Sequence, residues 1–345
     1  MDIFDTHVLN RVVEERVEPI NWLVANFFPE VSTSTDETIM FDKTNERQLV
    51  TPFVSPLHQG RVINEAGYET ESFRPAYAKD LRTFDPSKAF RRRPGEKIGG
   101  TLTPAQRLQA SVAFAADEQL SMLNRRFEVM AGDVLVNGTE TISGEAYPTV
   151  IVNFKRKASL RVVNSGADNW AVGKAGMIQQ VEDTAQEVAD ESGVAPDKVV
   201  MTSDSWKLLK TDPEFDKLID RTKNHKSDTD ILVGPRIFKK NSVRYVGHMG
   251  DLALYVYSGV YTDPEDMVTK PILPAFTVLV GGSGVDGVRH FGAIRDLDAG
   301  LQARQYFVKS WTTPNPSARW LLMQSAPLLV PYRINAVGSL TVYTA

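Results

Sequence analysis

A long amphipathic stretch, residues 103–138, constrains the fold of this chain more than any other feature. It opens with Thr103-Pro104, which is typical of a helix start because Thr can cap the first turn and Pro lacks an amide hydrogen that this turn leaves unpaired. It closes at Asn137-Gly138, a turn signal. Between these ends an apolar stripe recurs at steps of three and four, at Leu108, Val112, Ala116, Leu120, Leu123, Phe127, Met130 and Val134.

The predicted helix is long for a globular domain. About 30 residues would span roughly 45 Å at the usual rise, whereas helices average about three turns. The whole chain has 345 residues, which is too long for one compact core and short for three, so we expect two domains. Apolar residues make up 42% of the chain, an ordinary globular value that is sufficient for a buried core.

The composition excludes several classes of protein. Because the chain has no cysteine, disulfides, thiolate catalysis and thiolate metal sites are excluded. The five histidines are scattered, without the short spacing of a helical zinc site. The net charge is −4, and a protein that grips nucleic acid usually shows a basic excess. The sequence has neither a signal peptide nor an apolar run that could span a bilayer, so we expect a soluble protein made in the cytoplasm.

The middle of the chain alternates predicted helices and strands. Residues 172–193 form a second amphipathic helix that Gly193 closes. The motif Ser203-Asp204-Ser205 caps a third helix, whose apolar pattern continues to about residue 222. This alternation indicates a mixed α/β domain. Predicted strands lie at residues 149–154, 159–163, 199–202, 243–246, 252–258, 276–281, 320–330 and 336–343, the last two interrupted by Pro327 and Pro331.

The first 100 residues contain two segments that could bury few of their own apolar side chains. Residues 1–45 look like an arm, and its aromatic stretch at residues 22–28 either forms a short helix on its own core or docks on a neighbour. Residues 46–100 are rich in Gly and Pro and resemble a long two-stranded excursion. Such a hairpin is marginally stable alone, so it makes sense if it lies on another molecule. Its candidate strands are residues 51–54, 61–63 and 72–77.

Two motifs could bind a ligand, but both lack the necessary detail. The glycine-rich loop from Gly281 to Gly287 could cradle a phosphate, yet no Lys-Ser or Lys-Thr follows and no helix pattern starts there. Asp296 and Asp298 could hold a divalent cation, but no third acidic ligand surrounds them. We therefore expect a surface loop and a solvated turn.

Three further motifs have simple structural explanations. A helix cap accounts for Ser203-Asp204-Ser205, because no histidine stands where it could act as a base. Ser325 lies in an apolar strand and is expected to be buried or to face a neighbour. The basic run Arg91-Arg92-Arg93 favours a contact with another subunit or a solvated turn over a nucleic-acid patch. The sequence contains no catalytic constellation.

An ordered set of short motifs resembles the lambda-type major capsid family of tailed bacteriophages. The set covers nearly the whole chain in the order of the family, and its most specific member is Met323-Gln324-Ser325-Ala326-Pro327-Leu328. The other matching segments are residues 22–29, 54–63, 72–77, 137–148, 255–261 and 309–313.

The resemblance implies the Hong Kong 97-type capsid fold, an α+β architecture. In that fold, residues 1–45 would be the N-terminal arm and 46–100 the extended loop. Residues 101–160 would form the peripheral domain with its spine helix, and 161–295 the axial domain. Residues 296–345 would return as β segments that complete both domains. The loop from Gly281 to Gly287 would then belong to the axial domain, near the centre of a ring of subunits.

The resemblance also implies a function without chemistry. Copies of the chain would form hexamers and pentamers, then an icosahedral procapsid that expands when a separate motor packages DNA. No cofactor or metal is implied, and the shell would enclose DNA without sequence-specific binding. Burial of apolar residues between subunits would supply the association energy. The candidate contacts are the aromatic anchors Trp22, Phe27, Phe28, Phe73 and Tyr77, and the charged residues Arg91, Arg92 and Arg93.

Several expectations concern partners and alternatives. No helical scaffold segment precedes the arm, so a separate scaffolding protein is implied, together with a portal and a possible decoration protein. No Lys–Asn pair is identified for an isopeptide cross-link, and none is predicted. One alternative is a nucleotide-binding enzyme that uses the loop from Gly281 to Gly287. The other is an encapsulin-type compartment shell of the same fold.

Overall fold

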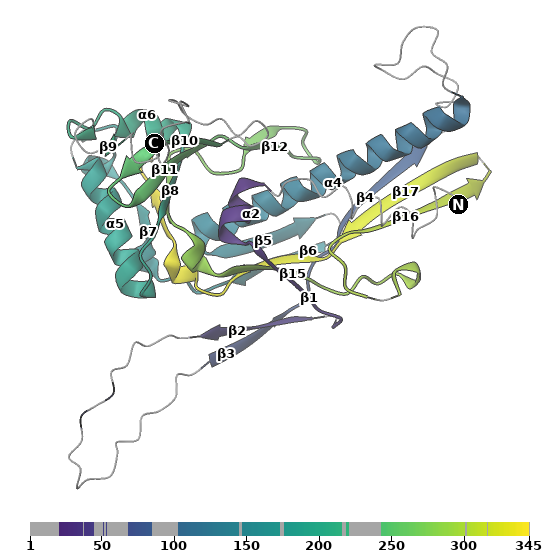
Figure 1. Ribbon diagram of the computed structural model, residues 1–345, viewed down its shortest axis with the longest axis horizontal. Coiled ribbons are helices and arrows are strands. Elements are labelled where there is room, and N and C mark those ends of the chain that lie inside the picture. Colours follow the sequence, from purple (N-terminus) through teal and green to yellow (C-terminus); the bar gives the residue numbers. More distant parts are fainter. Residues whose placement is uncertain are drawn as a thin grey trace, which may run out of the picture.

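The computed structural model describes residues 21–36, 38–44, 51, 53, 68–84, 103–144, 147–172, 176–215, 219–220, 243–300, 302–315 and 317–344. Helix α4 (Pro104–Asn137) runs through the molecule, and two sheets lie at its opposite ends (Figure 1). No helix within these ranges is both long enough and apolar enough to cross a membrane.

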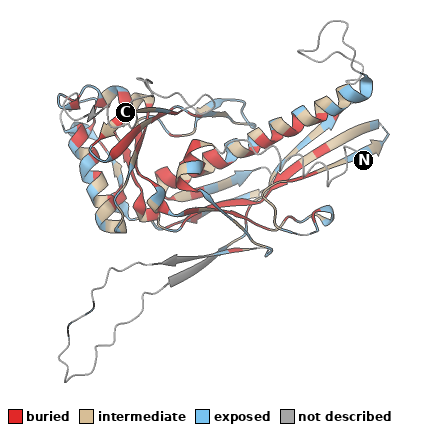
Figure 2. Cartoon of the chain, in the orientation of Figure 1, coloured by how far each residue is buried: buried red, intermediate tan, exposed pale blue. Residues whose placement is uncertain are grey.

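The predicted long helix is confirmed as α4. Thr103 and Gln106 form a capping box at its start, and Gly138 ends it in the left-handed region with a φ of 69°. All eight positions of the predicted apolar stripe are buried or packed against the core. Burial increases from the exposed N-terminal end of the helix toward its C-terminal end (Figure 2).

The N-terminal half of α4 lies on a three-stranded antiparallel sheet with the order β16-β17-β4. The side chain of Gln119 on α4 donates hydrogen bonds to the carbonyl oxygens of Asp80 (3.1 Å) and Leu321 (3.5 Å). The sheet combines distant parts of the chain, which local sequence patterns cannot reveal. Its strands are β4 (Ala78–Phe84), β16 (Phe307–Pro314) and β17 (Ser317–Ser325).

At the other end of α4 lies a seven-stranded mixed sheet that is covered on both faces. Val199 and Met201 pack with the helices α5 (Met177–Ser192) and α6 (Ser203–Leu209), whereas Val200 between them packs with the cluster that contains α4. This coverage explains why the central strands are apolar throughout. The sheet order is β7 (Arg161–Val163), β19 (Gly338–Thr341), β14 (Thr277–Gly281), β8 (Lys198–Thr202), β11 (Leu252–Tyr257), β10 (Val243–Met249) and β9 (Ile219–Asp220).

A third sheet binds the N-terminal segment between these two bodies. Helix α2 (Trp22–Phe27) packs on α4, and β1 (Glu30–Thr33) then pairs in parallel with β15 (Gly287–Phe291). Strand β15 also pairs in antiparallel fashion with β18 (Pro327–Pro331). Residues 21–33 of the predicted arm are therefore part of the folded body.

Three hairpins complete the described elements. The hairpin of β2 (Ile39–Thr44) and β3 (Tyr68–Phe73) projects away from the body (Figure 1). The others are β5 (Thr139–Gly144) with β6 (Tyr147–Asn153), and β12 (Val260–Thr262) with β13 (Thr269–Pro271). Short 3-10 turns lie at η1 (Ala158–Leu160), η2 (Gly166–Asp168), η3 (Ser283–Val285), η4 (Leu297–Ala299) and η5 (Ile334–Ala336).

The structure differs from the predicted elements at several points. The third helix ends at Leu209 instead of continuing to about residue 222, and Phe215 follows in a turn where its ring packs edge-on against Trp206. The Asp212 side chain accepts hydrogen bonds from the amides of Met177 and Ile178, so this turn also fixes the start of α5, five residues later than predicted. Residues 78–84, predicted in the extended loop, form β4 on α4. The candidate strand 61–63 lies outside the described residues, as does most of 51–54.

We predict that Phe27→Ala lowers the free energy of unfolding of the unassembled subunit by about 3–5 kcal/mol, the usual result of removing a fully buried aromatic ring. Phe27 is 0% exposed in the core cluster that contains α4. The measurement is urea unfolding followed by circular dichroism. Phe53→Ala is the control, because that ring is fully exposed and its removal should leave stability unchanged. Equal stability of the two variants would contradict an internal role for Phe27.

Candidate functional site

The space beside the glycines of the loop from Gly281 to Gly287 is occupied by other atoms of the same chain. It connects β14 to β15 through the single turn η3, so no helix follows that could bind a phosphate. A side chain at Gly282 would overlap Asp197, and one at Gly287 would overlap the backbone of Phe27. The interpretation of this loop as a phosphate cradle is therefore wrong. The expected surface loop is found only in part, since Ser283 and Asp286 are exposed but the residues at both ends of the loop are buried. Gly287 allows close packing on the N-terminal segment, and Gly282 allows close packing on Asp197.

The pair Asp296 and Asp298 binds a lysine. The Lys309 ammonium lies 2.5 Å from an Asp296 carboxylate oxygen and 3.4 Å from Asp298. The Asp296 side chain also accepts a hydrogen bond from the amide of Asp298. In the described part of the chain, no three His, Asp or Glu residues are grouped as metal ligands would be. The pair fixes the loop before β16.

The serine motifs are structural. Thr202 caps α6, and the Ser205 hydroxyl donates to the carbonyl oxygen of Thr277, which ties the helix to β14. Ser325 is fully buried at the end of β17. Neither serine lies beside a histidine that could act as a base in a hydrogen bond of the structure.

The predicted aromatic anchors at residues 22–28 lie in the core of their own subunit. Trp22 is 7% exposed, and Phe27 and Phe28 are 0% exposed. The Trp22 ring packs on Tyr255 of the seven-stranded sheet at a centroid distance of 4.8 Å. Of the two open readings, the structure therefore corresponds to the short helix on its own core. In this conformation the three rings have no surface to offer a neighbouring subunit.

The remaining predicted contact residues lie near the root of the projecting hairpin or outside the described ranges. Phe73 ends β3 and is half-buried against the core. Tyr77 is also half-buried, and its hydroxyl donates to the carbonyl oxygen of Ala293 at 2.7 Å. Burial raises the pKa of Tyr77. Arg91, Arg92 and Arg93 lie outside the described residues.

A buried carboxylate on α4 joins the N-terminal segment to the seven-stranded sheet. Glu128 is 2% exposed and accepts hydrogen bonds from the amides of Leu23 (2.9 Å) and Val24 (3.1 Å) at the start of α2. It also accepts one from the Tyr257 hydroxyl on β11 at 2.9 Å. Burial raises the pKa of Glu128, while the three donors lower it, and burial together with this carboxyl raises the pKa of Tyr257. All three hydrogen-bond donors are neutral, so they stabilise the buried carboxyl group only if the fold holds them in these positions.

A partly buried guanidinium forms a second joint at the C-terminal end of α4. Arg156 donates to the carbonyl oxygens of Leu135 (2.7 Å) and Val136 (2.5 Å), which the helix end leaves unpaired. It also donates to the Ser339 hydroxyl on β19 at 2.9 Å. Burial lowers its pKa to about 10. Together the two joints fix α4 against two strands of the seven-stranded sheet.

A second buried carboxyl group lies where β5 meets β18. Glu140 is 1% exposed, and one of its carboxyl oxygens accepts a weak hydrogen bond from the amide of Leu329 at 3.4 Å. The other carboxyl oxygen is buried without a hydrogen-bond partner. Burial raises the pKa of Glu140 to about 8. A neutral carboxylic acid is therefore the stable form at this position in neutral solution.

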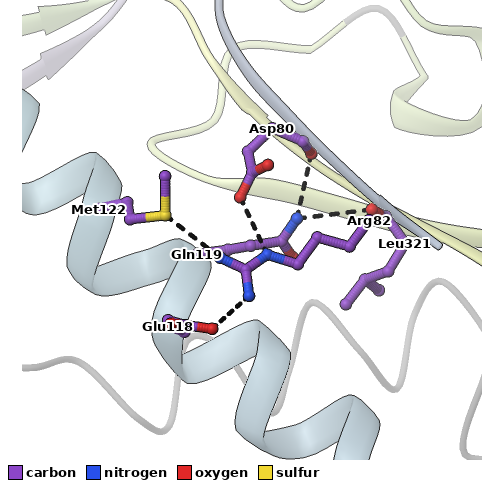
Figure 3. A network of polar contacts seen from close by, with 6 residues as sticks. All are labelled: Asp80, Arg82, Glu118, Gln119, Met122 and Leu321. Carbon is purple, nitrogen blue, oxygen red and sulfur yellow. Dashed lines mark hydrogen bonds and ion pairs between the residues drawn. The ribbon is translucent and has the colours of Figure 1, made fainter. Parts of the chain in front are cut away.

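Near the middle of α4, polar contacts attach the edge strand β4 to the helix (Figure 3). The Arg82 guanidinium binds the carboxylates of Asp80 on its own strand and Glu118 on α4, and contacts the Met122 sulfur at 3.2 Å. These groups are partly exposed, so each contact stabilises the sheet only modestly. Their geometry nevertheless fixes the angle between strand and helix.

Sequence reasoning missed the buried residues Glu128 and Glu140 and the partly buried Arg156. Glu128 does not occupy a position of the apolar stripe of α4, so the sequence pattern predicts an exposed polar residue beside Phe127. Arg156 lies in a loop with other basic residues. Only tertiary contacts across more than 100 residues identify Glu128 as buried. Glu140 lies in β5, a strand that the sequence analysis did not predict, so no pattern indicated its burial.

Comparisons with known proteins agree over the whole chain. Residues 5–342 match the family model described as phage major capsid protein E. The major capsid protein of Escherichia phage lambda is 28% identical over 335 residues, which are 96% of each chain. A crystal structure of a prophage capsid protein from E. coli CFT073 shares the fold with a TM-score of 0.72 at 22% identity, over 97% of this chain and 96% of that one. A subunit of the mature capsid of bacteriophage PhiM1 matches with a TM-score of 0.51 at 9% identity, over 94% and 87%.

We predict that stability of the unassembled subunit falls as pH rises from about 4.5 to about 8, through the titration of Glu140. Because the folded state holds this proton more tightly than the unfolded chain, whose carboxyl titrates near 4.5, the stabilisation is complete below that value and is lost toward pH 8. Glu140→Gln should remove this part of the pH profile and be more stable at pH 8, by on the order of 4 kcal/mol. Urea unfolding at several pH values measures it.

The control for the pH profile is Glu182→Gln, on the exposed face of α5. It should retain the pH dependence of the wild-type chain. If Glu140→Gln showed the same slope as the wild type between these pH values, Glu140 would not be the buried acid responsible.

We predict that Glu128 and Tyr257 are energetically coupled. Tyr257→Phe removes one hydrogen-bond donor and should lower the free energy of unfolding by about 1–2 kcal/mol. Glu128→Gln places an amide NH2 against the remaining donors and should lower that free energy by a similar or greater amount. Because the two groups share one hydrogen bond, the double variant should lose less than the sum, with a coupling of about 0.5–3 kcal/mol. A double-mutant cycle by urea unfolding measures it. Strict additivity would contradict the joint.

Proposed function

Because the chain belongs to the phage major capsid protein E family, we propose that it builds its shell from hexamers and pentamers in which the β2–β3 hairpin of one subunit lies across the next. The family membership makes the chain a major capsid protein that assembles with its own copies into the shell of a virion, and not an enzyme. Its fold is the Hong Kong 97-type capsid fold. Encapsulin-type shells have this fold too, but the matching family is that of phage capsids.

The projecting hairpin is the observation that carries the proposal. β2 and β3 pair only with each other among the described strands and leave the body without a helix to cover them (Figure 1). A two-stranded hairpin is marginally stable in water by itself. At its base Ile39 is buried, whereas the next residue, Met40, is 64% exposed. A neighbouring subunit would supply the surface that this hairpin lacks in one chain.

We assign the two bodies of the fold to the two domains of a capsid subunit. Helix α4 with β4, β16 and β17 corresponds to the peripheral domain. The seven-stranded sheet with α5 and α6 corresponds to the axial domain, and it extends from β7 to β14 and is completed by β19. Because strand β15 pairs with β18 outside this sheet, we propose an end of the axial domain near Gly281, where the sequence predicts residue 295. The axial domains would meet around the centre of each hexamer or pentamer.

Further contacts and partners belong to the same proposal. Arg91, Arg92 and Arg93 would contact a neighbouring subunit, and Phe73 and Tyr77 would stabilise the root of the hairpin that reaches it. Subunit interfaces of such shells typically exceed about 2,000 Å². A separate scaffolding protein, a portal and a decoration protein would act with the chain, and assembly would take place in the host cytoplasm. The shell would enclose DNA through a surface that does not read its sequence.

Electron microscopy of the purified protein tests the proposal. Negative staining of the chain, expressed with and without the neighbouring phage proteins, should show shells or six- and five-membered rings. Rings of any other number, or single subunits under every condition, would contradict the hexamer and pentamer arrangement. The same microscopy can be applied to the variant described next.

We predict that Met40→Asp lowers the yield of assembled particles about tenfold or more, because a charge would replace an apolar side chain in the contact with the next subunit. Stability of the unassembled subunit should stay within about 0.5 kcal/mol, since Met40 is exposed there. Sedimentation separates particles from subunits. Met40→Leu is the matched control and should assemble normally. Normal assembly of Met40→Asp would remove the hairpin from the interface.

A further inference from the structure

The C-terminal end of α4 contains the only Asn-Gly pair of the chain, Asn137-Gly138. In a flexible chain such a pair can modify itself, because the backbone nitrogen of a glycine is not shielded by a side chain. This nitrogen gives its proton to water and forms a bond to Cγ of the asparagine. The bond from Cγ to Nδ2 breaks, and the nitrogen leaves as ammonia after taking up a proton. Water then opens the cyclic imide to an aspartate or to an isoaspartate, in which the backbone runs through the side chain.

The folded subunit engages the groups that would react. The Gly138 amide is buried and donates a hydrogen bond to the carbonyl oxygen of Val134 at 2.8 Å. The Asn137 side-chain nitrogen donates to an Asp133 carboxylate oxygen at 2.6 Å, and the Asn137 side-chain oxygen accepts from Arg161 at 3.1 Å. Attack by the Gly138 nitrogen therefore requires the last turn of α4 to open first.

We propose that Asn137 is a spontaneous deamidation site, which folding of the C-terminal end of α4 closes and whose products weaken that end. Folding protects the pair in the way that it protects amide hydrogens from exchange, because the reaction proceeds only from the locally opened population. A chain that folds promptly keeps its asparagine, whereas a chain that stays unfolded loses it. The modification then marks chains that did not fold in time.

The aspartate product would place two carboxylates against each other. The Asn137 nitrogen now donates to Asp133, and a carboxylate has no hydrogen to donate, so a like-charge pair one turn apart replaces a hydrogen bond. Both charges would lie at the C-terminal end of the helix, where the helix dipole disfavours anions. Arg161 beside residue 137 offsets part of the repulsion. Asp133 also accepts from the Thr141 amide at 2.8 Å, so its displacement would disturb β5.

The isoaspartate product would displace Gly138 itself, because it adds a carbon to the backbone between residues 137 and 138. The Gly138 carbonyl oxygen accepts a hydrogen bond from the Phe154 amide at 3.1 Å. Gly138 also lies so close to Arg156 that a Cβ on the glycine would be 2.9 Å from the Arg156 Cβ. Arg156 is the residue whose guanidinium joins the end of α4 to Ser339 on β19. Both products therefore act on the contact between the long helix and the seven-stranded sheet.

Mass spectrometry of the unassembled chain tests the protection by folding. The chain is kept at one mildly alkaline pH, either folded in buffer or unfolded in guanidinium chloride, and the peptide that contains Asn137 is followed over time. We expect Asn137 to be the fastest asparagine to react in the unfolded chain, and to react about tenfold more slowly or less in the folded subunit. Asn137→Gln is the control and should remove the fast reaction, because its longer side chain closes a ring less readily. Equal rates in the two states, or a faster reaction at another asparagine, would overturn the proposal.

The variant Asn137→Asp tests the effect of the product, because it introduces the aspartate into a newly made chain. We expect its ratio of folded to unfolded subunits at neutral pH to be about tenfold lower, as when a hydrogen bond to a charged group is lost. Urea unfolding measures this ratio. The matched control is Asn335→Asp, which should leave stability unchanged, because the Asn335 side chain accepts from the Lys157 amide at 3.0 Å and a carboxylate accepts equally well. Failure of Asn137→Asp alone to fold would be the same effect in full, whereas equal stability of the two variants would contradict it.

Discussion

The buried carboxylate of Glu128 joins three parts of the chain that are far apart in sequence. Glu128 is a residue of α4. Its carboxylate accepts hydrogen bonds from the backbone amides of Leu23 and Val24 in α2, and from the Tyr257 hydroxyl in the seven-stranded sheet. A buried carboxylate without hydrogen bonds would be very unfavourable. The N-terminal segment, the long helix and the sheet must therefore keep their relative positions for this group to be satisfied. The placement of Trp22, Phe27 and Phe28 in the core follows from the same geometry.

Arg156 extends this constraint to the end of the helix. Its guanidinium binds carbonyl oxygens that α4 leaves unpaired, where the negative end of the helix dipole favours a cation. Buried charged groups often add less stability than apolar residues of equal volume, but they tolerate few alternative arrangements. The polar contacts of Glu128 and Arg156 thus add little stability, but they restrict the angle between helix and sheet. For a subunit that repeats around a closed shell, a defined angle between the domains is the property that assembly requires.

Elements whose signals are local could be predicted from the sequence. The capping box, the apolar stripe and the terminal glycine specified α4 nearly to the residue, because all three act within one helix. The end of α6 could not be predicted, since Phe215 has helical spacing but packs on Trp206 through a turn that Asp212 stabilises. Likewise, β4 joins a sheet with strands more than 200 residues away, and no local pattern contains that pairing. The family resemblance supplied the fold but not the polar groups Glu128, Glu140 and Arg156 inside it.

A capsid subunit must stay soluble alone and yet expose apolar surface to its neighbours. The structure separates these demands. Apolar groups of the N-terminal segment that could have served as anchors, such as Phe27 and Phe28, are fully buried and act inside the subunit. The exposed apolar surface lies instead on the projecting hairpin at Met40 and on the outer face of an edge sheet at Trp311 and Leu81. Because neither surface takes part in the hydrogen bonds of Glu128 or Arg156, both can be covered or uncovered without breaking those contacts. Assembly can then proceed through surfaces that the subunit does not need for its own fold.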